Sequence, residues 1–315
     1  MPFFSPRGRT PRLTPELDDA DLGKLLKRLQ SATRLSMAGG TEICVAQMAQ
    51  VLEPDDLSAD RRAHRLSVLA EFLSDSHLPS AWARREPRNP RALLLQAWSE
   101  LERGRGTGRM SDAAAAWKSC LLAAELDPAD PSPWVVMLGI ARLERYAERE
   151  VFAVWNEIVA RDRWNREAYL SMLAYLSPQE AGSLGQVLEF VGTLRTRMPA
   201  NAPCASVELA ADIMQYHSAL ARGGAEALLA RNHWNGSRVS QFLDRALVTW
   251  PSPAFFSHAA AIADLNLLAY ALNAAGGPRE TAPVFDAIGG RVTSRPWNAD
   301  GDPVAAFEAA HNKAR

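Results

Sequence analysis

A spacing of 35 residues between two similar loop phrases (162 − 127 = 35) constrains the fold of this chain more than any other feature of its sequence. Asp127-Pro128-Ala129-Asp130-Pro131 and Asp162-Arg163-Trp164-Asn165-Arg166 each follow one predicted helix and precede the next. The same shift matches like residues in the surrounding helices, apart from Cys120 with Trp155; the matched pairs are Trp117 with Phe152, Trp134 with Tyr169, Met137 with Met172 and Leu138 with Leu173. A period of about 20 to 50 residues indicates a repeat architecture.

An earlier phrase, Glu86-Pro87-Arg88-Asn89-Pro90, lies 41 residues before the first of these (127 − 86 = 41). The six residues in excess of the period predict an insert, which we assign to Gly104–Arg109 in a loop between helices, where repeats tolerate insertions. The glycines of this stretch do not indicate a phosphate-binding loop, because that motif follows a strand and these glycines follow a helix.

Apolar residues recur at spacings of three and four almost throughout the chain, whereas strand-like alternation is nearly absent. We therefore predict an all-α fold, an α-α superhelix in which antiparallel helix pairs stack as a solenoid. The predicted parts are a flexible tail at 1–13, an N-terminal helical cap at 14–79, repeats at 80–178, and C-terminal helical hairpins with a cap at 179–315. The last part is expected to continue the repeats.

Composition limits the class of protein. The chain has 315 residues, of which 47% are hydrophobic, and this excludes a disordered or fibrous protein. The net charge of -1 does not indicate a polyanionic partner. Cys44, Cys120 and Cys204 form no CxxC pair and no even set, so we predict buried thiols in a cytoplasmic protein. The most apolar stretch, Phe255–Ala275, contains polar residues that a membrane span would tolerate poorly, and we predict one buried helix there and no membrane contact.

The acidic-Pro phrase that ends one helix and the aromatic Trp134 that begins the next resemble the tetratricopeptide-repeat superfamily, whose helix pairs are about 34 residues long. A longer resemblance covers roughly residues 60 to 315. It is carried by Leu69-Ala70-Glu71, Ala92-Leu93-Leu94-Leu95, Val154-Trp155, Tyr175-Leu176, Gly182-Ser183, Val284-Phe285-Asp286-Ala287-Ile288-Gly289, Pro296-Trp297 and Asp302-Pro303. These segments resemble an uncharacterised actinobacterial family of tetratricopeptide-like helical proteins. The resemblance implies the fold and no particular activity.

The sequence contains no pattern typical of a common enzyme class. No HExxH segment offers a metal site, and no serine lies in a GxSxG turn. Acidic pairs such as Asp18-Asp19 and Asp55-Asp56 lie at helix starts, where carboxylates are favoured by the helix dipole. We therefore predict a protein without a cofactor or a metal, and more readily a non-enzymatic protein than an enzyme.

Basic residues are concentrated between Ala83 and Arg109, where seven arginines face three glutamates for a net charge of +4. Nucleic-acid binding would require such charge together with exposed aromatic rings, and the nearby Trp82 and Trp98 fall at core spacing. A nucleic-acid partner is therefore not favoured, whereas an acidic or phosphate-bearing partner stays open.

Two functional hypotheses remain. The first is a non-enzymatic helical-repeat protein, a scaffold or regulator, that binds a protein or peptide on the concave face of the stacked pairs. Its candidate groove residues are Gln96, Glu100, Arg142, Arg145, Tyr169 and Tyr175. The alternative is a small-molecule-binding or enzymatic helical domain with a pocket near His217 and His233. Its candidate residues are Gln215, Tyr216, His217, His233, Trp234 and Arg238.

Overall fold

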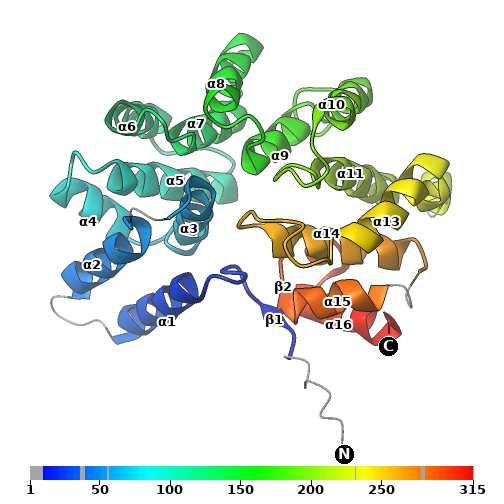
Figure 1. Ribbon diagram of the computed structural model, residues 1–315. Coiled ribbons are helices and arrows are strands. Elements are labelled where there is room, and N and C mark those ends of the chain that lie inside the picture. Colours follow the sequence, from blue (N-terminus) through cyan, green and yellow to red (C-terminus); the bar gives the residue numbers. More distant parts are fainter. Residues whose placement is uncertain (1–9, 36–39, 55–56, 231, 278–280, 315) are drawn as a thin grey trace, which may run out of the picture. The chain divides into compact units, whose positions relative to one another are not determined.

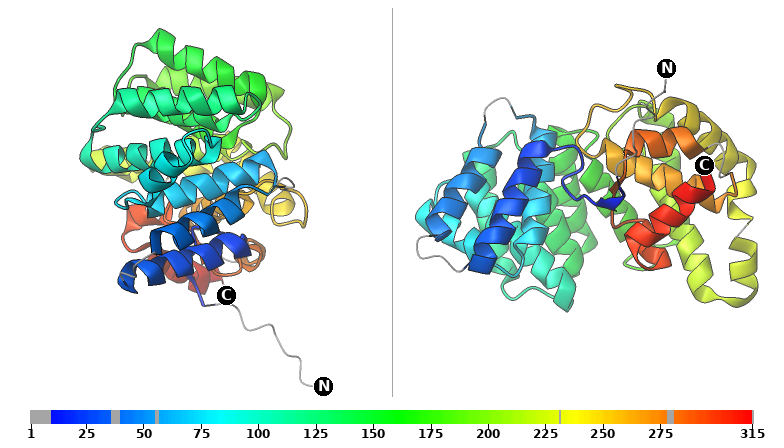
Figure 2. Two further views of the ribbon diagram at one scale, coloured as in Figure 1. Left: turned by 90° about the vertical axis from the view of Figure 1, so that its left-hand side faces the viewer. Right: turned by 90° about the horizontal axis from the view of Figure 1, so that it is seen from below.

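The computed structural model describes residues 10–35, 40–54, 57–230, 232–277 and 281–314 (Figures 1 and 2). Over these residues the structure contains sixteen α-helices and two short strands, so the predicted all-α fold is confirmed. None of the described helices is both long and apolar enough to cross a membrane. The chain forms two compact units: Asp18–Tyr175, here the N-terminal unit, and Leu176–Arg315 with Met1–Leu17, here the C-terminal unit.

In the N-terminal unit several helices contact both the next helix and the one after it. α5 packs against α3, α4, α6 and α7, and α7 packs against α6, α8 and α9, as antiparallel helix pairs do (Figure 1). The stacking of such pairs into a solenoid stays a prediction. The helices are α1 (Ala20–Leu35), α2 (Gly40–Leu52), α3 (Ala59–Phe72), α4 (Leu78–Arg85), α5 (Pro90–Thr107), α6 (Ala113–Leu126), α7 (Ser132–Leu143), α8 (Glu148–Arg161) and α9 (Arg166–Tyr175).

The 35-residue period is present in the helix positions. α6 and α8 each contain 14 residues, and they begin 35 residues apart (148 − 113 = 35). The residues that the shift matches also share an environment, since Met137 and Met172 are both buried, as are Leu138 and Leu173. The residues matched by the 35-residue shift therefore occupy equivalent packing positions in successive helix pairs.

The predicted loop at Gly104–Arg109 is wrong. α5 contains 18 residues and α7 contains 12, so the six extra residues (18 − 12 = 6) lengthen the helix instead of the loop. Gly104 is buried in the last turns of α5, where a Cβ atom would lie 2.8 Å from Cγ of Met110. The missing side chain thus lets the chain after α5 fold back against the helix. Gly108 ends the helix with a φ of 82°, which favours glycine.

A buried ion pair joins α1 to α3 in the N-terminal unit. The Asp19 carboxylate accepts a hydrogen bond from the backbone N–H of Leu22 at 3.0 Å, which confirms the predicted capping role of this acidic pair for Asp19. The same carboxylate accepts from Arg65 Nε at 2.7 Å and Nη2 at 3.0 Å. Burial raises the pKa of Asp19, but the hydrogen bonds from Arg65 and Leu22 outweigh burial and hold this pKa below its ordinary value.

The C-terminal unit is built around α14, which packs against α11, α13, α15 and α16. Its elements are β1 (Arg12–Leu13), α10 (Leu184–Arg197), α11 (Val207–Arg222), α12 (Gly224–Ala230), η1 (His233–Asn235), α13 (Ser237–Thr249), α14 (Ala261–Ala274), α15 (Ala282–Ile288), β2 (Arg291–Val292), η3 (Trp297–Asp300) and α16 (Pro303–Ala314). The helix predicted over Phe255–Ala275 begins only at Ala261. Residues 255–260 instead form turns and irregular structure that follow Ala254, whose φ is 64°.

The structure also differs from the predicted tail at 1–13. Arg12 and Leu13 form β1, which pairs in parallel with β2, with Arg12 opposite Arg291 and Leu13 opposite Val292. The remainder of the predicted tail, residues 1–9, lies outside the described residues.

Candidate functional site

A pocket of about 500 Å³ lies in the C-terminal unit, lined by residues of α10, α11 and the segment from α12 to η1. Its apolar wall consists of Leu184 and Val187 from α10, Met214 and Ala219 from α11, and Leu229 from α12. A volume of this size is typical of binding sites that take a ligand or the side chains of a partner.

Exposed leucines continue the apolar wall beyond the pocket on two sides. Leu184 and Leu188 lie one turn apart on α10 and are 49% and 52% exposed. Leu228 and Leu229 on α12 are 72% and 64% exposed. Leu184 and Leu229 line the pocket, while Leu188 lies one turn from Leu184 and Leu228 is next to Leu229. Exposed apolar surface beside a pocket is typical of an interaction site.

The pocket lining is also polar in part. Its polar and charged side chains are Gln179, Gln215, Ser218, Arg222, Glu226, Asn232 and His233. Among the described residues, the side chains of Gln215 and Asn232 have no hydrogen-bond partner. His233 Nε2 is buried without a hydrogen bond and lies 3.5 Å from an oxygen of Asp212. Gln215, Asn232 and His233 therefore offer hydrogen-bonding groups that a bound molecule can use.

Two buried carboxylates lie beside the lining residue His233 and join α11 to α13. Asp212 and Glu208 on α11 bind Arg238 on α13, at 2.5 Å from Nη2 and 2.7 Å from Nη1 respectively. Burial lowers the pKa of Arg238, but its hydrogen bonds and the charges of both carboxylates raise it above its ordinary value. Trp234, which is 1% exposed, packs edge-on against His233 and is tilted against Tyr216, with ring centroids 5.1 and 5.3 Å apart.

The structure thus brings together five of the six residues of the predicted alternative pocket. Gln215, Tyr216 and His233 line it, Trp234 packs beside Tyr216 and His233, and Arg238 anchors α11 to α13. The four exposed leucines were not predicted. The wide apolar face of α10, which also includes Val187, Val191 and Leu194, was the signal that could have indicated them.

His217 has a different role from the one predicted. Its Nε2 lies 2.7 Å from the hydroxyl of Tyr270, and that hydroxyl donates to Asp300 at 3.4 Å. Burial lowers the pKa of His217, although the Asp300 carboxylate acts in the opposite direction. Within the described part of the chain, no three His, Cys, Asp or Glu side chains are grouped as metal ligands would be.

This lowered pKa predicts a pH dependence of stability. Because the folded-state pKa of His217 lies below its ordinary value of 6.5, the unfolded chain takes up a proton first as the pH falls. The contribution of neutral His217 is therefore complete above about pH 6.5 and is lost as the pH falls below that value. His217→Gln, which retains a hydrogen-bonding group, should lose less stability than the wild type between pH 7.5 and pH 5.5 in urea unfolding. A variant with the wild-type pH dependence would contradict this role; His77→Gln, at an exposed position, is the control.

The six predicted groove residues do not form one open surface. Gln96 donates to Glu100 along α5 at 3.2 Å, and burial raises the pKa of Glu100. Arg142 lies in the last turn of α7, and Arg145 is exposed just after it.

The two tyrosines of this set pack between helices. Tyr169 is 7% exposed, and its ring centroid lies 4.8 Å from that of Trp155. Tyr175 is also buried, edge-on against Phe152. The prediction that they line a groove is therefore wrong, because the aromatic positions of the repeat are used for packing.

Comparisons of the chain with protein-family models, with curated proteins and with solved structures found no match. The resemblance to tetratricopeptide-repeat proteins therefore stays a prediction. The feature of this protein that bears on its function is therefore the pocket in the C-terminal unit.

Proposed function

We propose that this protein is a non-enzymatic helical-repeat protein that binds a segment of another protein, and that the pocket between α10, α11 and α12 takes apolar side chains of that segment. The observation that carries the proposal is the pair of exposed leucine rows, Leu184 with Leu188 and Leu228 with Leu229, on the two sides of the pocket. An amphipathic helix laid into an apolar groove uses such rows for its anchor residues. The free, buried cysteines support a cytoplasmic location.

A peptide fits this surface better than a small molecule does. A ligand that fills about 500 Å³ would cover the lining residues Leu184 and Leu229 but leave the neighbouring Leu188 and Leu228 in water. A longer partner, such as an amphipathic helix that presents several anchor residues, can also bury Leu188 and Leu228. The hydrophobic gain grows with the apolar area removed from water, so the larger partner is favoured.

A small molecule remains the second candidate because of the polar side chains that line the pocket. Gln215, Asn232 and His233 could orient one polar group of a compact, mostly apolar ligand. The two candidates differ in which leucines they need, since a small molecule would not require Leu188 and Leu228.

A selection of helical peptides tests the proposal. A displayed library of random 15-residue peptides would be selected on the wild-type protein, and binders would be measured on Leu188→Glu/Leu228→Glu. We expect peptides with apolar residues at helical spacing, and a loss of affinity of about tenfold or more in this variant, because each buried leucine contributes about 1.5 to 3 kcal/mol.

The control is Leu121→Glu/Leu122→Glu, which changes two exposed leucines of α6 in the other unit. This control should bind as the wild type does. Equal binding by both double variants would overturn the peptide proposal, and binding only of small apolar compounds, insensitive to Leu188 and Leu228, would favour the second candidate.

A further inference from the structure

Three of the seven arginines between Ala83 and Arg109 form an exposed group at the end of α4. The chain uses Arg91, Arg103 and Arg105 internally: Arg91 pairs with Asp127 and Asp130 at 2.7 and 3.0 Å, Arg103 donates to the carbonyl of Ser74, and Arg105 pairs with Glu102 at 2.7 Å. Arg84, Arg85 and Arg88 are exposed and have no partner among the described residues. Arg109 is also exposed, but it lies beyond the far end of the 18-residue α5.

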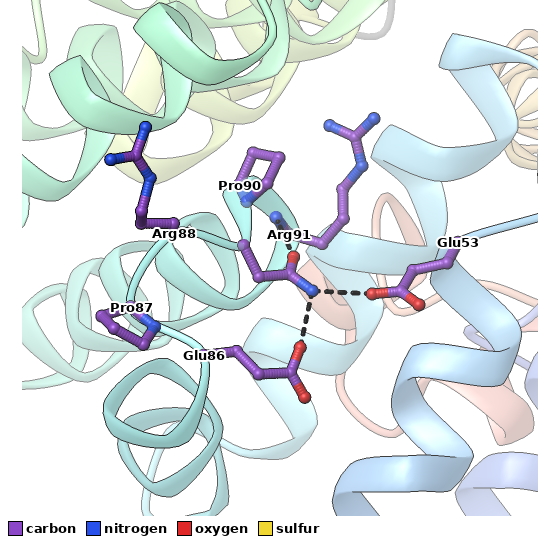
Figure 3. Close-up of a pocket in the computed structure, with 7 residues that line it drawn as sticks. Glu53, Glu86, Pro87, Arg88, Pro90 and Arg91 are labelled. Atoms are coloured by element: carbon purple, nitrogen blue, oxygen red, sulfur yellow. Dashed lines mark hydrogen bonds between the residues drawn. The ribbon is translucent and has the colours of Figure 1, made fainter.

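The two carboxylates that line a pocket together with Arg88 are held by Asn89. Arg88 lies at a shallow, open pocket of about 580 Å³ that Glu53 and Glu86 also line. Both carboxylates accept a hydrogen bond from Nδ2 of Asn89, at 2.7 and 2.8 Å. Figure 3 shows these carboxylates turned toward the same amide, while the Arg88 guanidinium points away from them.

Asn89 is itself fixed, because its side-chain oxygen caps α5 by accepting from the backbone N–H groups of Arg91 and Ala92. The cap therefore keeps Glu53 and Glu86 directed inward. The α4 dipole favours a basic residue in the last turn, which accounts for Arg84 and Arg85 in part. The helix dipole does not occupy the hydrogen-bond donors of Arg84 and Arg85. It also does not account for Arg88, because Arg88 follows the helix.

The three guanidinium groups of Arg84, Arg85 and Arg88 favour an acidic protein segment as their partner. Guanidinium groups bind carboxylates with paired, charge-assisted hydrogen bonds. A single-stranded nucleic acid would also need aromatic rings for its bases, and the two nearby candidates are buried, Trp82 at 0% and Trp98 at 5% exposed. We propose that Arg84, Arg85 and Arg88 form a docking surface for an Asp- or Glu-rich segment of a protein partner. This surface is independent of the pocket in the C-terminal unit.

The test uses a fluorescein-labelled peptide of ten glutamates and the full-length protein, measured by fluorescence anisotropy over a range of salt concentrations. We expect binding that weakens as salt rises. Arg84→Glu/Arg85→Glu/Arg88→Glu should bind about tenfold or more weakly, because three attractive contacts are lost and replaced by repulsion.

The matched control is Arg109→Glu/Lys118→Glu/Arg149→Glu, which reverses three exposed charges elsewhere in the same unit and gives the same net charge. It should retain wild-type affinity. Three outcomes would overturn the proposal: no binding of the peptide, an equal loss in both triple variants, or tighter binding of a labelled single-stranded oligonucleotide through the same three arginines. Circular dichroism would verify that both triple variants are folded, which their exposed positions favour.

Discussion

Asp19→Ala is expected to lower the free energy of unfolding by about 3 to 5 kcal/mol, the cost typical of breaking a buried ion pair from one side. The side chains of Asp19 and Arg65 are 3% and 10% exposed, so the substitution leaves a guanidinium buried without its counter-charge. It also removes the hydrogen bond to the N–H of Leu22 at the start of α1. Urea unfolding followed by circular dichroism measures the change.

Asp21→Ala is the matched control for this prediction. Asp21 lies two residues further along and pairs with Lys24 at 3.0 Å, but both side chains are about two-thirds exposed, at 65% and 66%. Exposed pairs of this kind contribute about 0 to 1 kcal/mol, so the control should unfold almost as the wild type does. If Asp19→Ala proved as mild as the control, the pair would not join α1 to α3. Asp19→Leu/Arg65→Met should recover part of the loss, since no charge is left unpaired.

Trp297→Ala is expected to cost about 3 to 5 kcal/mol in the C-terminal unit, as large-to-small substitutions of buried aromatic residues do. Trp297 is 1% exposed. Its ring packs edge-on against Tyr270 and Phe307, with centroids 5.3 and 5.4 Å away, and its Nε1–H donates to the side-chain oxygen of Asn266 at 2.9 Å. The substitution therefore removes packing on two sides and a buried hydrogen bond together. The shift in unfolding midpoint, with urea as denaturant, gives the cost.

Trp297→Phe separates these two contributions. Phenylalanine retains much of the aromatic packing but cannot donate a hydrogen bond to Asn266. The Asn266 oxygen would keep only the longer contact with the N–H of Thr293 at 3.4 Å. A loss of about 1 to 2 kcal/mol is expected. A cost as large as that of Trp297→Ala would contradict the argument that packing provides most of the stability at this position.

The features that were predicted correctly depend on local pattern. The phrases around Asp127 and Asp162 place α6 and α8 because a repeated loop fixes the helices on both sides of it. The errors occur where tertiary contacts decide the outcome. Glycine disfavours a helix by about 1 kcal/mol, yet the close approach of Met110 to Gly104 keeps that residue helical. The strand pair of β1 and β2 joins segments that no local pattern connects.

The candidate site was predictable to the extent that its residues are neighbours in sequence. Gln215 and Tyr216 are adjacent on α11, and His233 follows in the next loop, so their clustering required little tertiary information. His217 is one residue further along α11, and the rotation of about 100° per residue turns it toward Tyr270 instead. The exposure of Leu188 and Leu228 depends on which helices fail to cover them, and this is a property of the complete fold.

The pairing of β1 with β2 has a consequence for the order in which the protein can assemble during synthesis. Arg12 and its partner Arg291 are 279 residues apart (291 − 12 = 279), and translation at about 5 to 20 residues per second separates their synthesis by roughly 15 to 60 s. The whole of Asp18–Tyr175 is made within that interval and can fold before the C-terminal unit is closed. A fragment that begins at Leu176 would lack both β1 and the core residue Leu17, so a segment made before the N-terminal unit completes the unit that follows it.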